Sequence, residues 1–267
     1  MSVTVYLQRW LAQSGRAVQR VMVEWLNLLH LGAGILVLAM SPASYTASNR
    51  AILVRHMYVN TAPILLGFTL LCALVTVVLT RIVLVTALSY GLSQYALQVV
   101  IRVLVLELIP LTAALFVALR CTIPDGAELT AMQASGELDE MRERGGEPVR
   151  REVLPSVVAG MFSGITLAAL SCVVALVVAY MATYGFALSG LAAYTRLFGQ
   201  VFSPSVTLIF VLKTLFFCLA VSQIPMASAL YGMGAASVRT SAEMRGLVRM
   251  FAVLLLIEVA SLVGNYY

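Results

Sequence analysis

The chain has 267 residues, of which 61% are hydrophobic and 11% are charged, and its mean hydropathy is +0.96. A soluble domain typically carries about 25% charged residues, so this composition excludes a soluble globular protein. Several apolar runs have the length of a bilayer-spanning helix, which predicts an all-α polytopic membrane protein. The net charge of +5 arises from sixteen Arg and one Lys against twelve acids. Basic residues in a membrane protein first report orientation, so no nucleic-acid partner is inferred from them.

The N-terminal part predicts a structure at the membrane surface. Residues 1–28 place apolar side chains at near-helical spacing, with Arg and Gln on the other face, which is typical of an amphipathic interfacial (elbow) helix. The run from Leu28 to Met40 is too short to cross a bilayer and is expected to enter one leaflet. We therefore predict an interfacial and re-entrant segment over residues 1–56 and a five-span domain over residues 57–267.

Five apolar runs are predicted to cross the membrane: 62–87, 95–119, 157–184, 206–224 and 247–263. The segments before the first run, between the second and third, and between the fourth and fifth, together with the first residues of the fifth run, hold thirteen of the sixteen Arg. The positive-inside rule therefore places the N-terminus and residues 120–152 in the cytoplasm. Five crossings then place the C-terminus on the opposite side.

Residues 120–152, which we call the coupling segment, form the charge-dense part of the chain and hold eight of its twelve acids. Pro124 and Asp125 are typical of a helix start, and Gly145-Gly146 is typical of a helix end, so one short cytoplasmic helix is predicted. An apolar stripe on this helix would dock a soluble partner: Ala127, Leu129, Met132, Leu138 and Met141. The alternative is a solvated helix without a partner.

Three ionisable residues lie well inside apolar runs: Glu107, Lys213 and Glu258. A charge at bilayer depth costs at least about 2.5–3.5 kcal/mol, so such residues face a partner or a cavity. Pairing of Lys213 with either acid predicts a structural ion pair; a polar cavity lining and a proton relay are the alternatives. Pro110 disturbs the helix beside Glu107, which either widens a cavity or only shapes the helix.

No motif for catalysis, metal binding or nucleotide binding is recognisable. The four cysteines have no paired spacing and are interpreted as reduced, small apolar residues, and the two histidines make no metal pattern. The only Lys lies in an apolar run, so the chain has no lysine for a phosphate-binding loop. We expect no cofactor and no enzymatic activity, and any ATP used must be bound by another chain.

The chain resembles the MlaE-type permeases, the membrane subunits of MCE-associated ABC lipid transporters. The residues that carry the resemblance are Leu106-Glu107-Leu108-Ile109-Pro110, Leu119-Arg120, Ala127-Glu128-Leu129-Thr130, Met132 and Glu147-Pro148. Leu53 to Tyr58 looks like the family's entry to the first span, and Lys213 and Glu258 fall where such permeases carry a Lys and an acid. Residues Leu106, Ile109, Leu119 and Thr130 replace the family's Arg and Gly residues, so the chain looks like a diverged member.

The resemblance implies a homodimeric permease in a bacterial inner membrane, with its C-terminus in the periplasm. A separate ABC ATPase would bind the cytoplasmic helix, an MCE-domain protein would cap the outer face, and a STAS-domain protein would bind the ATPase. Phospholipid would move between the inner and outer membranes through a cavity at the dimer axis, lined or braced by Glu107, Pro110, Lys213 and Glu258. The implied ATPase contacts are Arg120, Glu128, Leu129, Met132, Leu138 and Met141. A self-sufficient secondary transporter or channel and a non-transporting scaffold are the alternatives.

Overall fold

The structure, a computed structural model, describes residues 22–23, 25–39, 41, 47–145, 147–231 and 236–266. Within these ranges the regular structure is helical and contains no strand, which confirms the predicted all-α class. Most of the interfacial helix predicted over residues 1–28 lies outside the described ranges. The short apolar helix Trp25–Ala39 is described, and its Leu31 and Ile35 are buried.

Five helices are long and apolar enough to cross a membrane: Arg50–Ser89, Tyr95–Ser135, Val149–Tyr184, Pro204–Tyr231 and Gly246–Asn265. They confirm the five predicted crossings, and each extends beyond its apolar run. The first belongs to α2 (Ala47–Ser89), so the domain boundary expected after residue 56 lies inside a helix. The helix Tyr95–Ser135, which we call the second rod, contains α3 (Ser93–Val100) from residue 95 onward, α4 (Ile109–Val117) and α5 (Ile123–Ser135).

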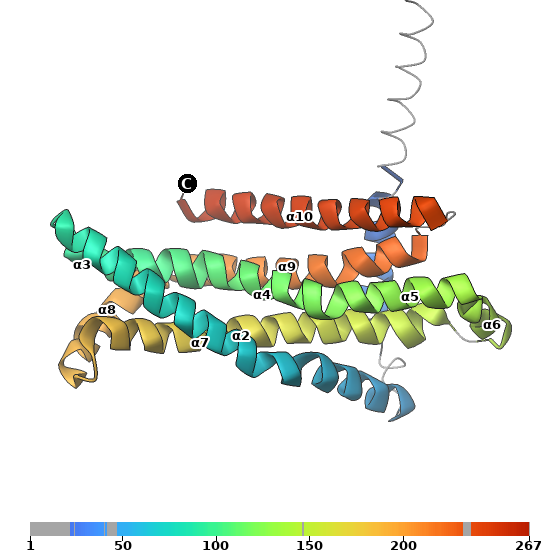
Figure 1. Ribbon diagram of the computed structural model, residues 1–267, viewed down its shortest axis with the longest axis horizontal. Helices are drawn as coiled ribbons and strands as arrows, with labels where there is room; N and C mark the ends of the chain where they lie inside the picture. Colours follow the sequence, from blue (N-terminus) through green and yellow to red (C-terminus); the bar gives the residue numbers. More distant parts are fainter. Residues whose placement is uncertain are drawn as a thin grey trace, which may run out of the picture.

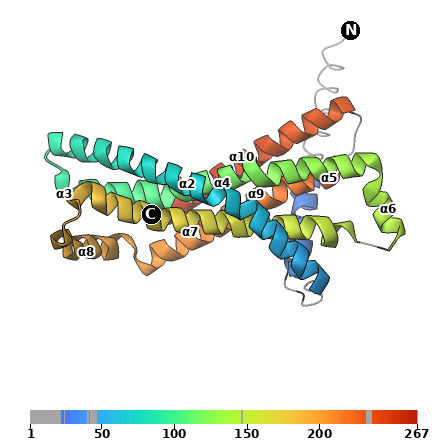
Figure 2. The same ribbon diagram turned by 60° about the horizontal axis from the view of Figure 1, so that its bottom comes forward.

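The remaining elements complete the bundle in chain order. They are α6 (Glu137–Glu143), α7 (Leu154–Tyr184), α8 (Leu191–Val201), α9 (Pro204–Tyr231) and α10 (Ala236–Tyr266). The α2 helix crosses α7 obliquely, and α9 packs against α4, α5, α7 and α10 (Figure 1, Figure 2). The α3 and α8 helices lie at one end of the bundle with the C-terminus, and α5 and α6 form the other end (Figure 1). The two ends differ in charge, because the end with α5 and α6 contains the charge-dense coupling segment.

Three prolines each follow a π-helical turn. The residues before Pro110, Pro124 and Pro155 donate their amides five residues back, from Ile109 to Leu104, from Ile123 to Ala118 and from Leu154 to Val149. A proline lacks an amide hydrogen, and its ring clashes with the carbonyl four residues earlier. The wider π-helical turn moves that carbonyl away, so the helix continues through the proline.

The structure therefore corrects the predicted single helix from Pro124 to Arg144. Pro124 lies inside the second rod, and α5 is the continuation of this membrane helix. The break comes at Gly136, whose φ of 82° is the left-handed conformation that favours glycine. The described part of the coupling segment consequently contains two α-helices, α5 and α6, and α5 continues the second span without a break.

Large apolar side chains cover the outside of the bundle as well as its interior. On α2, Leu66, Leu70 and Leu74 are exposed, and on α10, Leu255 and Leu256 are exposed. Exposed apolar surface of this extent is unfavourable in water but is the expected outer surface of a membrane protein. All four cysteines are buried and free, as the sequence indicated.

Candidate functional site

The three charges inside the apolar runs come together at one point in the structure. Lys213 of α9 contacts the Glu107 carboxylate of the second rod, and its Nζ lies 2.8 Å from Glu258 Oε2 of α10. The Lys213 side chain is 1% exposed, and those of Glu107 and Glu258 are 14% and 16% exposed. The predicted ion pair is therefore present, and it includes both acids. We call these three residues the charge triad.

The depth of the charge triad explains why all three residues pair with one another. Lys213 lies nine residues after Pro204, where α9 begins, which is about 14 Å along a helix and about half the thickness of the hydrocarbon core. An unpaired charge at that depth loses its hydration without compensation. Lys213 also lies 5.5 Å from the centroid of the Phe217 ring, within the range of a cation–π interaction.

Pro110 leaves the backbone carbonyl of Leu106 available as a further partner for Lys213. A residue with an amide hydrogen at position 110 would donate to the carbonyl of Leu106 in an α-helix, and proline cannot. The Nζ of Lys213 donates a hydrogen bond to that carbonyl across 3.5 Å. Pro110 is itself buried in α4. Its position therefore leaves an acceptor beside the charge triad, which is a more specific role than the predicted disturbance of the helix.

An apolar groove of about 450 Å³ lies beside Lys213, between α9 and α10. Its walls are apolar side chains, including Ile209 and Phe216 of α9 and Leu256 of α10. Ser261 adds a buried hydroxyl on the α10 side. The groove thus combines an apolar wall with one buried ammonium group and its paired carboxylates, a combination suited to an amphipathic molecule.

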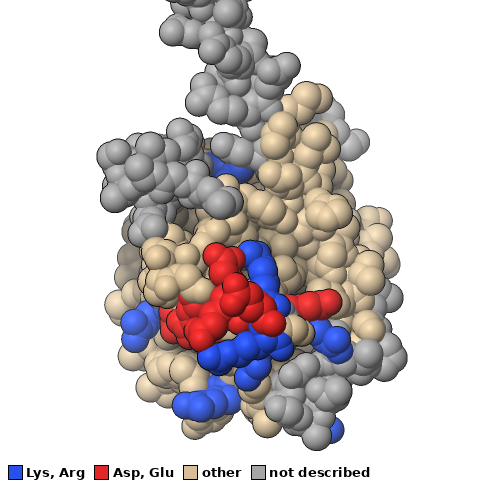
Figure 3. Space-filling view, turned by 90° about the vertical axis from the view of Figure 1, so that its right-hand side faces the viewer, with Lys and Arg blue, Asp and Glu red and all other residues tan. Residues whose placement is uncertain are grey.

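The other candidate site is the charged end of the bundle, which α5, α6 and the chain after them form. Acidic side chains gather at its centre and basic side chains border them (Figure 3). Glu128 and Arg120 are exposed. Two exposed ion pairs brace α6: Arg142 with Asp139 at 2.9 Å, and Arg144 with Glu140 at 2.5 Å. Exposed pairs of this kind contribute little stability, so this end presents charge for recognition more than for folding.

The apolar stripe predicted for partner binding is wrong for two of its members. Leu129 and Leu138 are 4% and 2% exposed, and they pack into one cluster with Leu31, Val157 and Met226. A second span that continues into α5 turns this face toward α9 and the helix Trp25–Ala39, so these leucines fill the protein's own core. Met132 and Met141 are half-buried and Ala127 is exposed. The outward surface of the coupling segment is mainly polar.

Asp125 lies in the first turn of α5, as predicted. Its carboxylate also accepts a hydrogen bond from Ser156 of α7. Next to it, Thr122 donates to the carbonyl of Val221 in α9. Sequence reasoning missed Thr122, although Pro225, four residues after Val221, signals a carbonyl without its helical donor.

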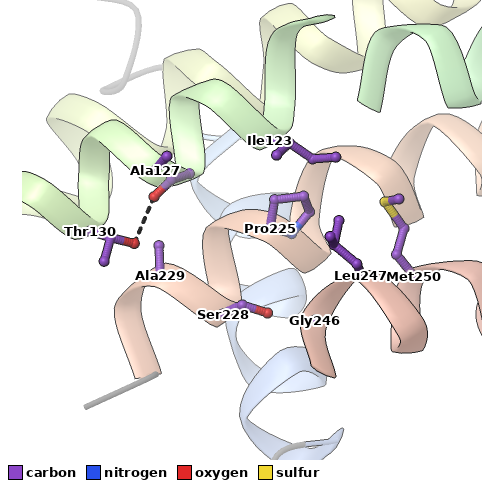
Figure 4. Close-up of a pocket in the computed structure, with 10 residues that line it drawn as sticks. Ile123, Ala127, Thr130, Pro225, Ser228, Ala229, Gly246, Leu247 and Met250 are labelled. Carbon is purple, nitrogen blue, oxygen red and sulfur yellow. Dashed lines mark hydrogen bonds between the residues drawn. The ribbon is translucent and has the colours of Figure 1, made fainter. Parts of the chain in front are cut away.

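A smaller pocket of about 130 Å³ lies at the same end, between α5, α9 and α10 (Figure 4). Pro225, Ala229 and Leu247 line it with Ile123, Ala127 and Met250. Thr130 donates a hydrogen bond to Gly126 within α5, at 2.8 Å, so its hydroxyl is already used (Figure 4). On the α10 side of the pocket, the Arg249 guanidinium donates a hydrogen bond to the Ser228 hydroxyl of α9 at 3.0 Å.

Residues 53–263 match the model of the family described as Permease MlaE. The matched range contains the charge triad, Pro110, the coupling segment and most of the five membrane-length helices. No curated protein matches the chain.

Proposed function

Because the chain belongs to the MlaE permease family and is thus a membrane permease subunit of an ABC-type transporter, we propose that it moves phospholipid between the inner and outer membranes of a bacterial envelope. Two copies would form the transmembrane core. A separate ABC ATPase would supply the energy, an MCE-domain protein would receive or deliver lipid at the outer face, and a STAS-domain protein would bind the ATPase.

The observation that carries this proposal is the charge triad beside the apolar groove. A phospholipid combines apolar chains with a charged headgroup, and the groove offers apolar walls next to Lys213 and two carboxylates. A small ion or polar solute has no apolar surface to pack against the apolar walls of the groove. The groove lies between α9 and α10, where a second copy of the chain would enclose it into a larger cavity.

The charged end of the bundle supports coupling to a separate ATPase. It is exposed, it is joined without a break to the second span, and Glu128 and Arg120 lie on it. A force applied to α5 would therefore act directly on the helix that carries Glu107. The positive-inside rule gives this end a cytoplasmic position, where ATP is available, and gives the C-terminus at the opposite end a periplasmic one.

The experiment that tests the proposal is purification of the tagged chain from its native membrane in mild detergent, with mass spectrometry of bound proteins and lipids. We expect an ATPase, an MCE-domain protein and phospholipid in the eluate. A chain that purifies alone in several detergents would contradict the proposal and favour a self-sufficient membrane transporter.

Glu128 offers a sharper test of the ATPase contact. We predict that Glu128→Lys lowers ATPase binding by about tenfold or more, because a reversed charge in a complementary interface is repelled. Co-purification of the ATPase and its affinity for the detergent-solubilised permease give the measurement. Glu128→Asp is the matched control, since it keeps the negative charge at the same exposed position and should retain ATPase binding. Normal assembly and transport with Glu128→Lys would remove Glu128 from the contact.

A further inference from the structure

Pro225 creates an acceptor in the second half of α9 that the helix cannot satisfy by itself. In an α-helix the residue at 225 would donate to the carbonyl of Val221, but proline has no amide hydrogen. The fully buried Thr122 donates its hydroxyl to that carbonyl at 2.8 Å. Because Val221 and Thr122 are both fully buried, a protein group has to supply the donor. The bond joins the start of α5 to α9 from a position 99 residues earlier in the chain.

Glycines allow the helices around this hydrogen bond to pack closely. A Cβ on Gly126 of α5 would lie 3.2 Å from the Pro225 carbonyl oxygen, and a Cβ on Gly160 of α7 would lie 2.8 Å from Thr122 Cγ2. One turn away, a Cβ on Gly164 would lie 2.6 Å from Cys218 Sγ. A larger residue at any of these positions would have to displace the neighbouring helix or its side chains, so the glycines permit close approach. The helices α5, α7 and α9 therefore meet in a close contact, which we call the junction.

The junction lies between the two candidate sites. On one side of it, α5 leads to the exposed Glu128 and to α6. On the other side, α9 leads from Val221 to Lys213, eight residues and about 12 Å along the helix. Three polar contacts tie the second rod to α9: Lys213 binds Glu107 and the Leu106 carbonyl, Thr122 binds the Val221 carbonyl, and Gln133 Nε2 donates to the Leu230 carbonyl at 3.4 Å. In the first two, the side chain binds a carbonyl that a proline has left without its helical donor.

We infer that Thr122 is a positioning residue that makes α5 and α9 move as one body, so that displacement of the coupling segment reaches the charge triad. The inference rests on the proposed function, because it assumes that an ATPase acts on the coupling segment. Loss of the hydroxyl leaves the Val221 carbonyl without its donor and allows α5 to shift against α9. ATP hydrolysis then continues while less of the motion reaches Lys213.

The test compares Thr122→Val with the wild-type permease in the complete complex, reconstituted into phospholipid vesicles. Valine has nearly the size and shape of threonine and replaces the hydroxyl by a methyl group, which cannot donate a hydrogen bond. We expect phospholipid moved per ATP hydrolysed to fall about tenfold, in line with the loss of a buried hydrogen bond, with ATPase binding unchanged. Thr122→Ser keeps the donor and should retain coupling. Thr112→Val is the matched control, because the Thr112 hydroxyl binds carbonyls of its own rod, those of Leu108 and Ile109.

A second variant keeps the inference testable if Thr122→Val does not assemble. Pro225→Ala supplies the missing amide to Val221, so Thr122→Val combined with Pro225→Ala should recover assembly and most of the coupling. Wild-type coupling in Thr122→Val alone, or no recovery in the double variant, would overturn the role of Thr122. If the wild-type complex moves no phospholipid with ATP, the proposed function fails, and this inference fails with it. If the wild-type complex moves phospholipid and Thr122→Val couples normally, only the inference about Thr122 fails.

Discussion

The two sides of α9 are packed in different ways. On the side of α5 and α7, glycines bring the backbones together, and Thr122 closes the junction with a hydrogen bond. On the side of α10, the structure has the 130 Å³ pocket and the 450 Å³ groove, both lined by α9 and α10. Polar contacts span this looser side, from Lys213 to Glu258 and from Arg249 to Ser228. One close contact is present here too, since a Cβ on Gly246 of α10 would lie 2.6 Å from Ser228 Oγ. The two sides therefore differ mainly in that the spaces open to a ligand lie along α10.

The largest loss of stability is expected at Lys213, which binds both the second rod, through Glu107, and α10, through Glu258. Lys213→Met leaves two carboxylates at bilayer depth without their cation, and breaking a buried pair in this way costs about 3–5 kcal/mol. We predict a clear loss of folded protein and of melting temperature in detergent. Replacing all three members, with Glu107→Gln, Lys213→Met and Glu258→Gln, should restore most of the stability but not transport. A stable and active Lys213→Met would show that the charge triad is dispensable.

On the close side, adding one methyl group should be costly. Gly160→Ala places a Cβ 2.7 Å from Ser222 Oγ and 2.8 Å from Thr122 Cγ2, and overpacking of this kind costs about 1–3 kcal/mol. The melting temperature in detergent gives the measurement. Gly67→Ala in α2 is the control, because nothing lies within 4 Å of its Cβ position, and it should be neutral or stabilising. Equal effects of the two substitutions would contradict close packing at the junction.

On the looser side, adding volume should be tolerated. Ala229 lines the pocket between α5, α9 and α10 (Figure 4). Ala229→Val adds two carbon atoms to a space of about 130 Å³, and we expect a gain of about 0.5–1 kcal/mol in stability, as for other cavity-filling substitutions. Thermal unfolding of the purified permease is the check. A destabilisation as large as that of Gly160→Ala would remove the difference between the two sides of α9.

The membrane architecture could be predicted from the sequence because it depends on run length and on Arg placement, which are local properties. The convergence of the three buried charges could be anticipated in part, since a lone Lys213 in lipid requires an acid. Which acid it would use depends on how the second rod, α9 and α10 pack, and the structure brings both to it.

The predictions failed where the role of a residue depends on how the helices pack, which the local sequence does not show. Pro124 is typical of a helix start, yet a π-helical turn before it lets the membrane helix continue into α5. The stripe with Leu129 and Leu138 had the periodicity of a docking face, but periodicity cannot distinguish a face that binds a partner from one that packs in the chain's own core. Thr122 carried no signal of its own, since its importance comes from Pro225 in another helix.

The most direct test of the account is ATP-dependent movement of a fluorescent phospholipid by the complete complex in vesicles, with the wild-type permease and with the triple neutral variant of the charge triad. We predict ATP-dependent movement for the wild type, and its loss in a variant that still folds and still binds the ATPase. Lipid movement at the wild-type rate in the neutral variant would contradict a role for the charge triad in transport. No movement by the wild-type complex would contradict phospholipid transport itself.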